Sequence, residues 1–161
     1  MISRRSKGGI GYSVFNFSNV RHIVAMARPR TGETLREQAH DALQTIETVM
    51  REKSTRGAIV KQTVFMRGRE ELDECRQVIR DFYGADMPAT TFVAQPLCSG
   101  KLLAIEALGI CQSSGDVEIE RHSESLVVTR CQGMTWAYCG HITPNSSDPS
   151  VYARSYSAFE R

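Results

Sequence analysis

The first third of the chain changes from alternating to helical spacing of hydrophobic residues. Tyr12 to Phe17 alternates, and Ile23 to Ala27 is a short apolar run beyond a Ser-Asn pair, so this segment predicts a β-hairpin. A helix is predicted from about Leu35 to Glu52, with Thr34 as its N-cap and Glu37 as the capping-box partner. The hydrophobic residues that recur there at helical spacing are Leu35, Ala39, Ala42, Leu43, Ile46, Val49 and Met50.

The middle of the chain repeats this alternation of strand and helix patterns. Ile59 to Met66 is short, apolar and rich in β-branched residues, as a strand is. Residues 69–83 carry hydrophobic side chains on one helical face, and Gly84 is expected to end that helix. Two further apolar runs, 91–93 and 102–110, predict strands. The order β-β-α-β-α-β-β predicts an α+β fold in which two helices pack on one face of a sheet.

The last third of the chain begins the same order again. Residues 125–130 and 134–139 predict a second hairpin, and Asp148-Pro149 is a typical helix start. The chain stops at Arg161, within that helix. We therefore divide the chain into a basic tail (1–8), a complete unit (9–111), a small polar linker (112–117) and a partial second copy of the unit (118–161).

Composition narrows the function classes. The 161 residues are 41% hydrophobic and 24% charged, as in a globular protein, and no run approaches the ~18 apolar residues of a membrane span. The net charge of +2, with both signs mixed along the chain, gives no basis for a nucleic-acid partner. Five cysteines without CxxC spacing argue against a disulfide framework or a zinc knuckle and favour a reduced, cytoplasmic setting.

Glu106 stands out because it interrupts the apolar run at 102–110, between Ile105 and Ala107. The apolar neighbours predict that the carboxylate is buried. A buried carboxylate costs several kcal/mol unless it is hydrogen-bonded. Either a nearby backbone donor or a function must therefore account for Glu106.

Four short segments of the chain together resemble the Rid (YjgF-like) family of reactive-intermediate imine deaminases. They are Ile59-Val60-Lys61-Gln62-Thr63-Val64-Phe65, Phe82-Tyr83-Gly84, Met87-Pro88-Ala89 and Ile105-Glu106-Ala107, and a Cys139-Gly140-His141-Ile142 loop in the second copy is similar to the family's Ser-Gly-Gln-Ile. The resemblance implies that residues 9–111 are a Rid-like domain with a bacterial chorismate-mutase-like fold. It also implies a homotrimer with clefts between subunits.

The resemblance implies roles for individual residues. Glu106 matches the glutamate that handles the water for imine hydrolysis, and Tyr12 falls where the family has a cleft tyrosine. The family's arginine, which grips the substrate carboxylate, is replaced by Thr90, which offers no two-pronged charged fork. The first-copy loop is Ala25-Met26-Ala27 in place of Ser-Gly-Gln. These changes predict a substrate pocket different from the family's usual one.

Several other residues are candidates for the pocket. Thr91 offers a hydroxyl, and Cys98 lies in the loop where the family's cleft is lined; the alternatives are a strand threonine and an inert thiol. Cys139 and His141 could pair as nucleophile and base, but residues two apart on a loop need not face each other. No metal ligand set and no phosphate-binding loop is predicted, so we expect no cofactor.

Two functions follow from these observations. The first is a Rid-like hydrolase that releases ammonia from a small enamine or imine, with Glu106 as the catalytic residue and Tyr12, Thr90, Thr91 and Cys98 binding the substrate. The second is a non-catalytic module of the same fold that binds a small metabolite or an assembly partner. A ribonuclease is disfavoured, because no basic groove can be named.

Overall fold

Alternating burial along the longer strands shows how the chain forms a two-faced sheet. The computed structural model describes residues 2–7, 10–17, 20–53, 58–112, 117–142 and 150–159. Its main sheet has six strands in the order β1-β2-β3-β6-β4-β5, and every pair is antiparallel except β4–β5. The strands are β1 (Ile2–Lys7), β2 (Ile10–Phe17), β3 (Val20–Ala27), β4 (Ala58–Met66), β5 (Ala89–Ala94) and β6 (Leu103–Gln112).

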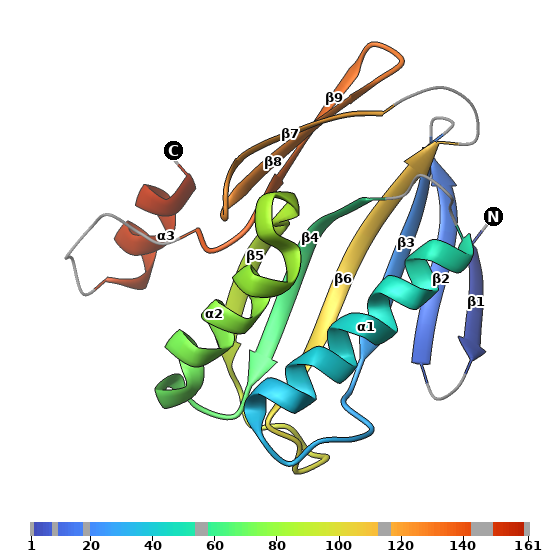
Figure 1. Ribbon diagram of the computed structural model, residues 1–161. Coiled ribbons are helices and arrows are strands. Elements are labelled where there is room, and N and C mark those ends of the chain that lie inside the picture. The colour runs from blue at the N-terminus through green and yellow to red at the C-terminus, as the bar shows by residue number, and fades with distance from the viewer. Residues whose placement is uncertain are drawn as a thin grey trace.

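Two helices lie on one face of this sheet, as the sequence pattern predicted (Figure 1). They are α1 (Leu35–Lys53) and α2 (Leu72–Tyr83); short 3₁₀ turns, η1 (Arg69–Glu71) and η2 (Gly84–Asp86), flank α2. The capping box at the start of α1 is confirmed. The Glu37 amide donates to Thr34 Oγ1 at 3.2 Å, and the Thr34 amide donates to Glu37 Oε2 at 3.0 Å.

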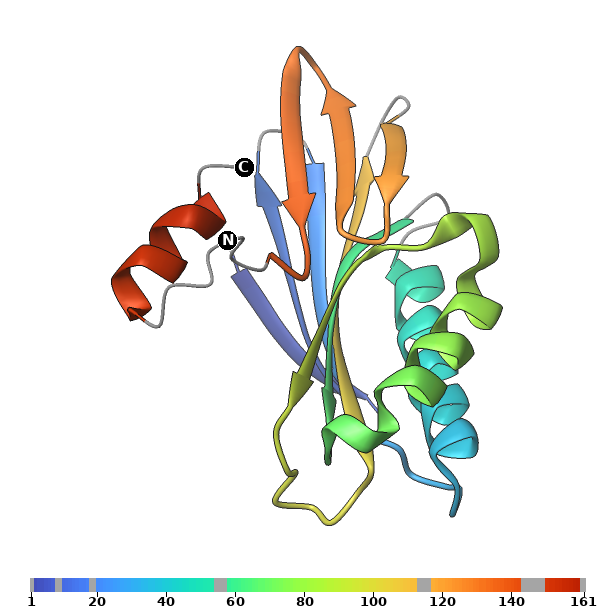
Figure 2. The ribbon, with the colours of Figure 1, turned by 90° about the vertical axis from the view of Figure 1, so that its left-hand side faces the viewer.

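The main hydrophobic core fills the space between the helices and the sheet. Strand residues that share a face alternate, so β6 contributes Leu103, Ile105 and Ala107 to this core. From α1 the core receives Leu43 and Ile46, both fully buried. Helices α1 and α2 do not cover the opposite face of the main sheet, which we call the open face (Figure 2).

A second, three-stranded sheet follows the main one in the chain. It has the order β7-β8-β9, from β7 (Glu118–Ser123), β8 (Leu126–Cys131) and β9 (Met134–Cys139), and α3 (Val151–Phe159) comes after it. Its apolar side packs on one end of the open face, where it forms a smaller core. That core consists of Val20, Val60, Ala89, Ile110, Val127, Cys131 and Tyr138. The C-terminal sheet thus lies at one end of the main sheet, where its β7–β8 turn also reaches α2 through Arg80 and Glu124, and α3 lies on the side away from α1 and α2 (Figure 2).

Arg121 ties the C-terminal sheet to the main one. Its guanidinium donates to the Ile59 carbonyl at 3.3 Å and to the Met87 carbonyl at 3.0 Å, and it lies 3.6 Å from Asp86 Oδ1. Two carbonyls that would otherwise be left at the end of the sheet thereby gain a donor. The C-terminal segment is therefore packed against the first unit of the same chain.

Some of the sequence predictions need correction, and others stay open. Residues 2–7, predicted as part of a basic tail, form β1, because the free edge of β2 offers backbone partners whatever the side chains are. β7 was not predicted. Gln112, assigned to the linker, belongs to β6, while residues 113–116 and the proposed cap at Asp148-Pro149 lie outside the described residues. The partial second copy remains a prediction.

In the part of the chain that the structure describes, no helix combines the length and hydropathy needed to cross a membrane.

Candidate functional site

Glu106 lies near the middle of the open face, and its side chain is exposed in the single chain. The prediction that it is buried is therefore wrong. Its neighbours Ile105 and Ala107 are buried because they point toward the helices, and successive residues of a strand point to opposite faces. Apolar residues directly before and after a strand residue therefore predict that the face opposite to that residue is buried, and they say nothing about the residue itself.

A row of side chains crosses the open face at Glu106. Met26 of β3 and Thr63 of β4 are its direct partners on either side, and Thr91 of β5 is the partner of Thr63. Two strand spacings separate Glu106 from Thr91, roughly 10 Å. The structure therefore places two of the predicted site residues, Glu106 and Thr91, on one face.

The loop that follows β9 reaches the end of this row. The His141 amide donates to Thr91 Oγ1 at 3.0 Å, and His141 adopts a left-handed backbone conformation with φ of 50°. Gly140 is buried against Thr90, so closely that a Cβ there would lie 2.7 Å from the Thr90 backbone nitrogen and oxygen. The Gly-containing loop of the C-terminal segment thus contacts the strand that carries Thr90 and Thr91 in the same chain.

Thr90 points away from the open face and is only 2% exposed. Its hydroxyl donates to the Pro88 carbonyl at 2.8 Å and accepts from Gln62 Nε2 at 3.0 Å. The Tyr83 hydroxyl is 3.2 Å from Gln62 Oε1, and burial raises the pKa of this phenol. Thr90 is therefore part of a buried hydrogen-bond network and is on the other face from Glu106.

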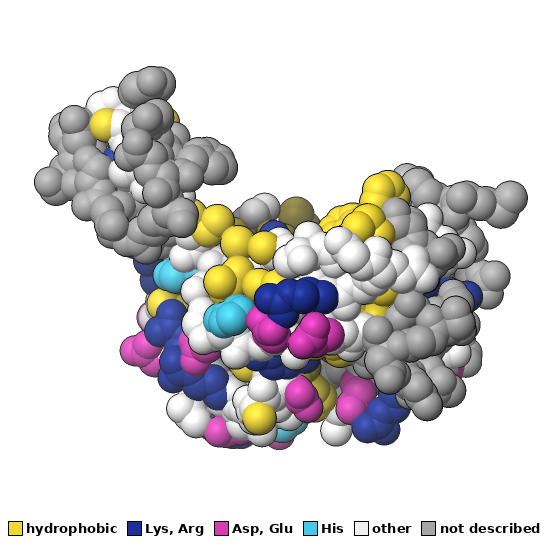
Figure 3. Space-filling model, turned by 90° about the horizontal axis from the view of Figure 1, so that it is seen from above, with side chains coloured by type: hydrophobic (Ala, Val, Ile, Leu, Met, Phe, Trp, Pro, Cys, Tyr) yellow, Lys and Arg dark blue, Asp and Glu magenta, His cyan; other side chains and the backbone are white. Residues whose placement is uncertain are grey.

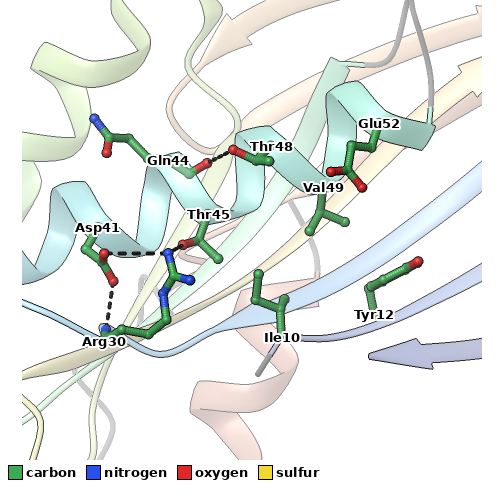
Figure 4. A pocket seen from close by; sticks show the side chains of 9 residues that line it. All are labelled: Ile10, Tyr12, Arg30, Asp41, Gln44, Thr45, Thr48, Val49 and Glu52. Carbon is green, nitrogen blue, oxygen red and sulfur yellow. Dashed lines mark hydrogen bonds and ion pairs between the residues drawn. The ribbon is translucent and has the colours of Figure 1, made fainter. Parts of the chain in front are cut away.

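Tyr12 also lies on the helix side of the sheet, because it pairs with Ala25 and Ala25 pairs with Ala107. It is 6% exposed and lines a cavity of about 300 Å³ between α1 and β2 (Figure 4). On the far side of this cavity the Arg30 amide donates to Asp41 Oδ2 at 2.7 Å. Within one chain, Tyr12 and Glu106 do not meet.

The two cysteines considered as candidates are both exposed. Cys98 lies in the turn between β5 and β6, at the opposite end of β5 from the His141 loop. Cys139 ends β9, and neither thiol lines the cavity beside Tyr12 or the cavity at the edge of β5. In the described ranges, no three His, Cys, Asp or Glu side chains are grouped so that they could hold a metal ion.

Sequence reasoning missed a second cavity, of about 150 Å³, at the edge of β5. Arg76 of α2 and Glu124 and Ser125 of the β7–β8 turn line it together with Thr90, Phe92 and His141. No local sequence signal marks Arg76 or Glu124. Arg76 and Glu124 come together only because the C-terminal sheet packs beside α2. Arg80 of α2 binds Glu124, which lies 44 residues further along the chain.

Comparisons with known proteins show the fold. A crystal structure described as a "putative translation initiation inhibitor" from Salmonella typhimurium matches with a TM-score of 0.56 at 17% identity, over 66% of this chain and 95% of that one. Yeast Mmf1 matches with a TM-score of 0.51 at 18% identity, over 59% of this chain and 82% of that one. The YjgF gene product of E. coli gives 23% identity and a TM-score of 0.49, over 63% and 86%.

No protein-family model matches the sequence, and the search of curated proteins gave no match. At these identities the similarity establishes architecture only. The α+β arrangement with two helices on one face of the sheet is confirmed, and the chain has the Rid-like (YjgF-like) fold that its sequence resembles.

Proposed function

We propose that this protein is a Rid-like hydrolase that converts a small enamine or imine into a carbonyl compound and ammonia. The observation that carries the proposal is a carboxylate, Glu106, exposed in the middle of the open face between Met26 and Thr63. A charged side chain on such a face is unfavourable once the face is covered, unless the charge is used. The position matches the glutamate that the family resemblance assigns to water handling.

The open face has the character of a surface that another copy covers. Phe17 is 53% exposed and Met26 is 43% exposed, both on this face. Seen from above, hydrophobic side chains gather on the side of the molecule away from the helices, whereas charged ones gather on the helix side (Figure 3). We propose that a homotrimer covers this face and forms a cleft around Glu106, because large exposed apolar patches mark interaction surfaces.

The proposed step needs only water and the carboxylate. Glu106 accepts a proton from a water molecule as the water oxygen attacks the imine carbon, and it then gives this proton to the nitrogen, which yields a neutral carbinolamine. The carbinolamine hydroxyl proton passes to the nitrogen as the C–N bond breaks, so the nitrogen leaves as ammonia, a C=O bond forms and Glu106 is again a carboxylate. General base catalysis of this kind contributes about 10²–10⁴ in rate. Thr91, held by the His141 amide, and Thr63 offer hydroxyls along the same row.

Ammonia release from 2-aminoacrylate generated in the assay tests this proposal. We expect Glu106→Ala to lower the rate by about 10²-fold or more, since it removes the proton acceptor. Glu118→Ala is the matched control, because Glu118 is also an exposed strand glutamate but lies on β7, outside the row. Equal rates for wild type and Glu106→Ala, or no turnover of any imine by wild type, would reject the hydrolase.

The alternative is a binding module of the same fold without catalysis. It is favoured by Thr90, whose hydroxyl is already committed to Gln62 and Pro88 and which supplies no charge to a substrate. This function predicts that wild type and Glu106→Ala bind the same metabolite equally and that neither turns it over. Calorimetric titration with the substrate's stable carbonyl product separates the two functions.

A further inference from the structure

A cavity of about 300 Å³ lies on the helix side of the main sheet, whereas Glu106 lies on the open face (Figure 4). Strand β2, helix α1 and the loop from β3 to α1 build its walls. Its volume is roughly that of ten water molecules in the liquid, at the lower end of the range for small-molecule sites. The cavity is therefore large enough for a small ligand, and it is separate from the proposed hydrolase site.

Helix α1 gives this cavity a polar wall. The lining residues from the helix include Asp41, Thr45, Thr48 and Glu52. They are three or four residues apart, so they share one face of α1 over roughly 16 Å. Thr45 is 5% exposed, and the Asp41 side chain is 16% exposed. A helix side that faces a sheet is ordinarily apolar, and polar groups withdrawn from water need hydrogen-bonding partners.

The Thr45 hydroxyl lacks an acceptor in the described part of the chain. Its only partner there is the Arg30 guanidinium, whose Nη2 lies 3.4 Å from Thr45 Oγ1. A guanidinium can only donate, so the hydroxyl hydrogen of Thr45 is left over. Thr48 differs, because its hydroxyl donates to the Gln44 carbonyl at 2.8 Å. A buried hydroxyl without an acceptor is unfavourable, and an oxygen atom of a ligand in the cavity would relieve it.

Asp41 has acceptor positions left over. The Arg30 amide donates to Oδ2 at 2.7 Å, and the Thr31 hydroxyl donates to Oδ1 at 3.1 Å. The Arg30 Nη2 atom is 3.9 Å from Oδ1, which makes an ion pair but not a hydrogen bond. A carboxylate has about four lone-pair sites, and these two hydrogen bonds use two of them. Asp41 can therefore accept from a ligand as well.

The charges that line the cavity favour an uncharged ligand. Arg30 lies beside Asp41, so a cation bound to Asp41 would face the guanidinium charge. Glu52 adds a second carboxylate to the described lining, and the resulting excess of one negative charge disfavours an anion. A hydroxyl group both accepts and donates. It therefore satisfies Thr45 and Asp41 without bringing a charge into the cavity.

The wall opposite the polar side chains is apolar. Ile10 of β2 points toward Val49 of α1, and Tyr12 lies beside Ile10 on the same strand (Figure 4). Val49 and Tyr12 are both buried and belong to the main hydrophobic core. A sugar ring has C–H groups on its faces and hydroxyls around its edge. A ligand of this kind fits a cavity with one apolar and one polar wall.

We propose that this cavity binds an uncharged sugar of the size of a hexose. One hydroxyl of the sugar accepts from Thr45, a neighbouring hydroxyl donates to Asp41, and the ring packs between Ile10 and Val49. The proposal does not depend on the proposed hydrolase, because none of the lining residues belongs to the row that contains Glu106.

Calorimetric titration of the full chain with D-glucose, D-galactose and D-mannose tests the site. We expect at least one of these sugars to bind, and the corresponding uronate, which adds a carboxylate, to bind about threefold more weakly or worse. Thr45→Val should weaken sugar binding about fivefold, since it removes one hydrogen bond and keeps nearly the same shape. Asp41→Asn should weaken it about tenfold or more, because a charged acceptor is lost.

Asp81→Asn is the matched control for Asp41→Asn. Asp81 is also a helix aspartate beside an arginine, 3.8 Å from Arg36, but it lies outside the cavity. This control should bind the sugar as wild type does.

A wild-type measurement guards against a variant that does not fold. In an NMR titration, the sugar should shift the amide resonances of Thr45 and Val49 more than that of Gly133 in the β8–β9 turn. Binding of none of the three hexoses to wild type would show that the cavity holds water only and would overturn the proposal. Unchanged affinity in folded Thr45→Val and Asp41→Asn, or tighter binding of a uronate than of its hexose, would overturn it as well.

Discussion

Replacing Gly140 by alanine should separate the C-terminal sheet from the edge of β5. A Cβ at this position would lie 2.7 Å from both the nitrogen and the oxygen of Thr90, whereas ordinary contact begins at 3.4 Å. The atoms in its way are backbone atoms, which cannot turn aside as a flexible side chain can. The loop carrying Gly140 must therefore move by about 0.7 Å or more.

The cost can be worked out from the contacts at this seam. Overpacking a well-packed site costs about 1–3 kcal/mol. The shift also strains two hydrogen bonds, from the Thr90 amide to the Glu124 carbonyl at 2.8 Å and from the His141 amide to Thr91 Oγ1 at 3.0 Å. Each is worth about 1 kcal/mol net. If the loop moves, the overpacking is relieved but the two hydrogen bonds are weakened, so the two costs are not added together. We therefore expect Gly140→Ala to lower the free energy of unfolding by about 2 kcal/mol.

Urea denaturation measures the free energy, and hydrogen exchange of the Thr90 amide reports the local opening. Gly11→Ala is the control, because no atom lies within 4 Å of the Cβ it would add. We expect that control to change the stability by less than about 0.5 kcal/mol. If the two variants were equally stable and the Thr90 amide were equally protected in both, the Gly140 loop would not be closely packed against β5.

Four further expectations concern other parts of the fold. Thr34→Ala should cost about 1 kcal/mol in urea denaturation, because it removes the capping acceptor of the Glu37 amide. The hydrogen bond from the Thr34 amide, more than any other group, holds the pKa of Glu37 below its ordinary value. The ionised Glu37 therefore adds to the free energy of unfolding above the unfolded pKa of about 4.3, and this stabilisation is lost as the pH falls below it. Glu37→Gln should make the stability less dependent on acid pH, and an unchanged acid profile would contradict this. Burial raises the pKa of Cys75 to about 12, so iodoacetamide at pH 8 should modify Cys98 in the native protein but Cys75 only after unfolding, as read by peptide mass mapping. Thr90→Arg should prevent stable folding, since the position is 2% exposed and the charge would be unpaired; a folded variant with the wild-type midpoint would contradict this.

The elements that could be predicted from the sequence are those that depend on local signals. Thr34 and Glu37 lie three residues apart and cap the same turn, so their pairing is visible without any tertiary contact. The spacing of the hydrophobic residues predicted the two helices, and their packing on one face of the sheet was also predicted correctly. β1 and β7 were not predicted, because a strand at the edge of a sheet pairs through backbone groups. Every residue has these groups, so the pairing leaves no pattern in the sequence.

The candidate site was harder to predict because it depends on strand register. Whether Tyr12 shares a face with Glu106 is decided by the pairings Tyr12–Ala25 and Met26–Glu106, and a shift of one residue would reverse the answer. The burial of Glu106 was misjudged for the same reason. Arg76 could not be found at all, because its cavity exists only where α2, β5 and a turn more than 40 residues later come together.

The proposed hydrolase rests on Glu106 acting in a cleft that forms when other copies cover the open face. The most direct measurement is the specific rate of ammonia release by wild type and Glu106→Gln, taken across protein concentrations at which sedimentation shows assembly. We predict that the wild-type specific rate rises as the chains assemble and that Glu106→Gln stays at least about 10²-fold slower throughout. A rate that is the same in both proteins at every concentration would contradict the account.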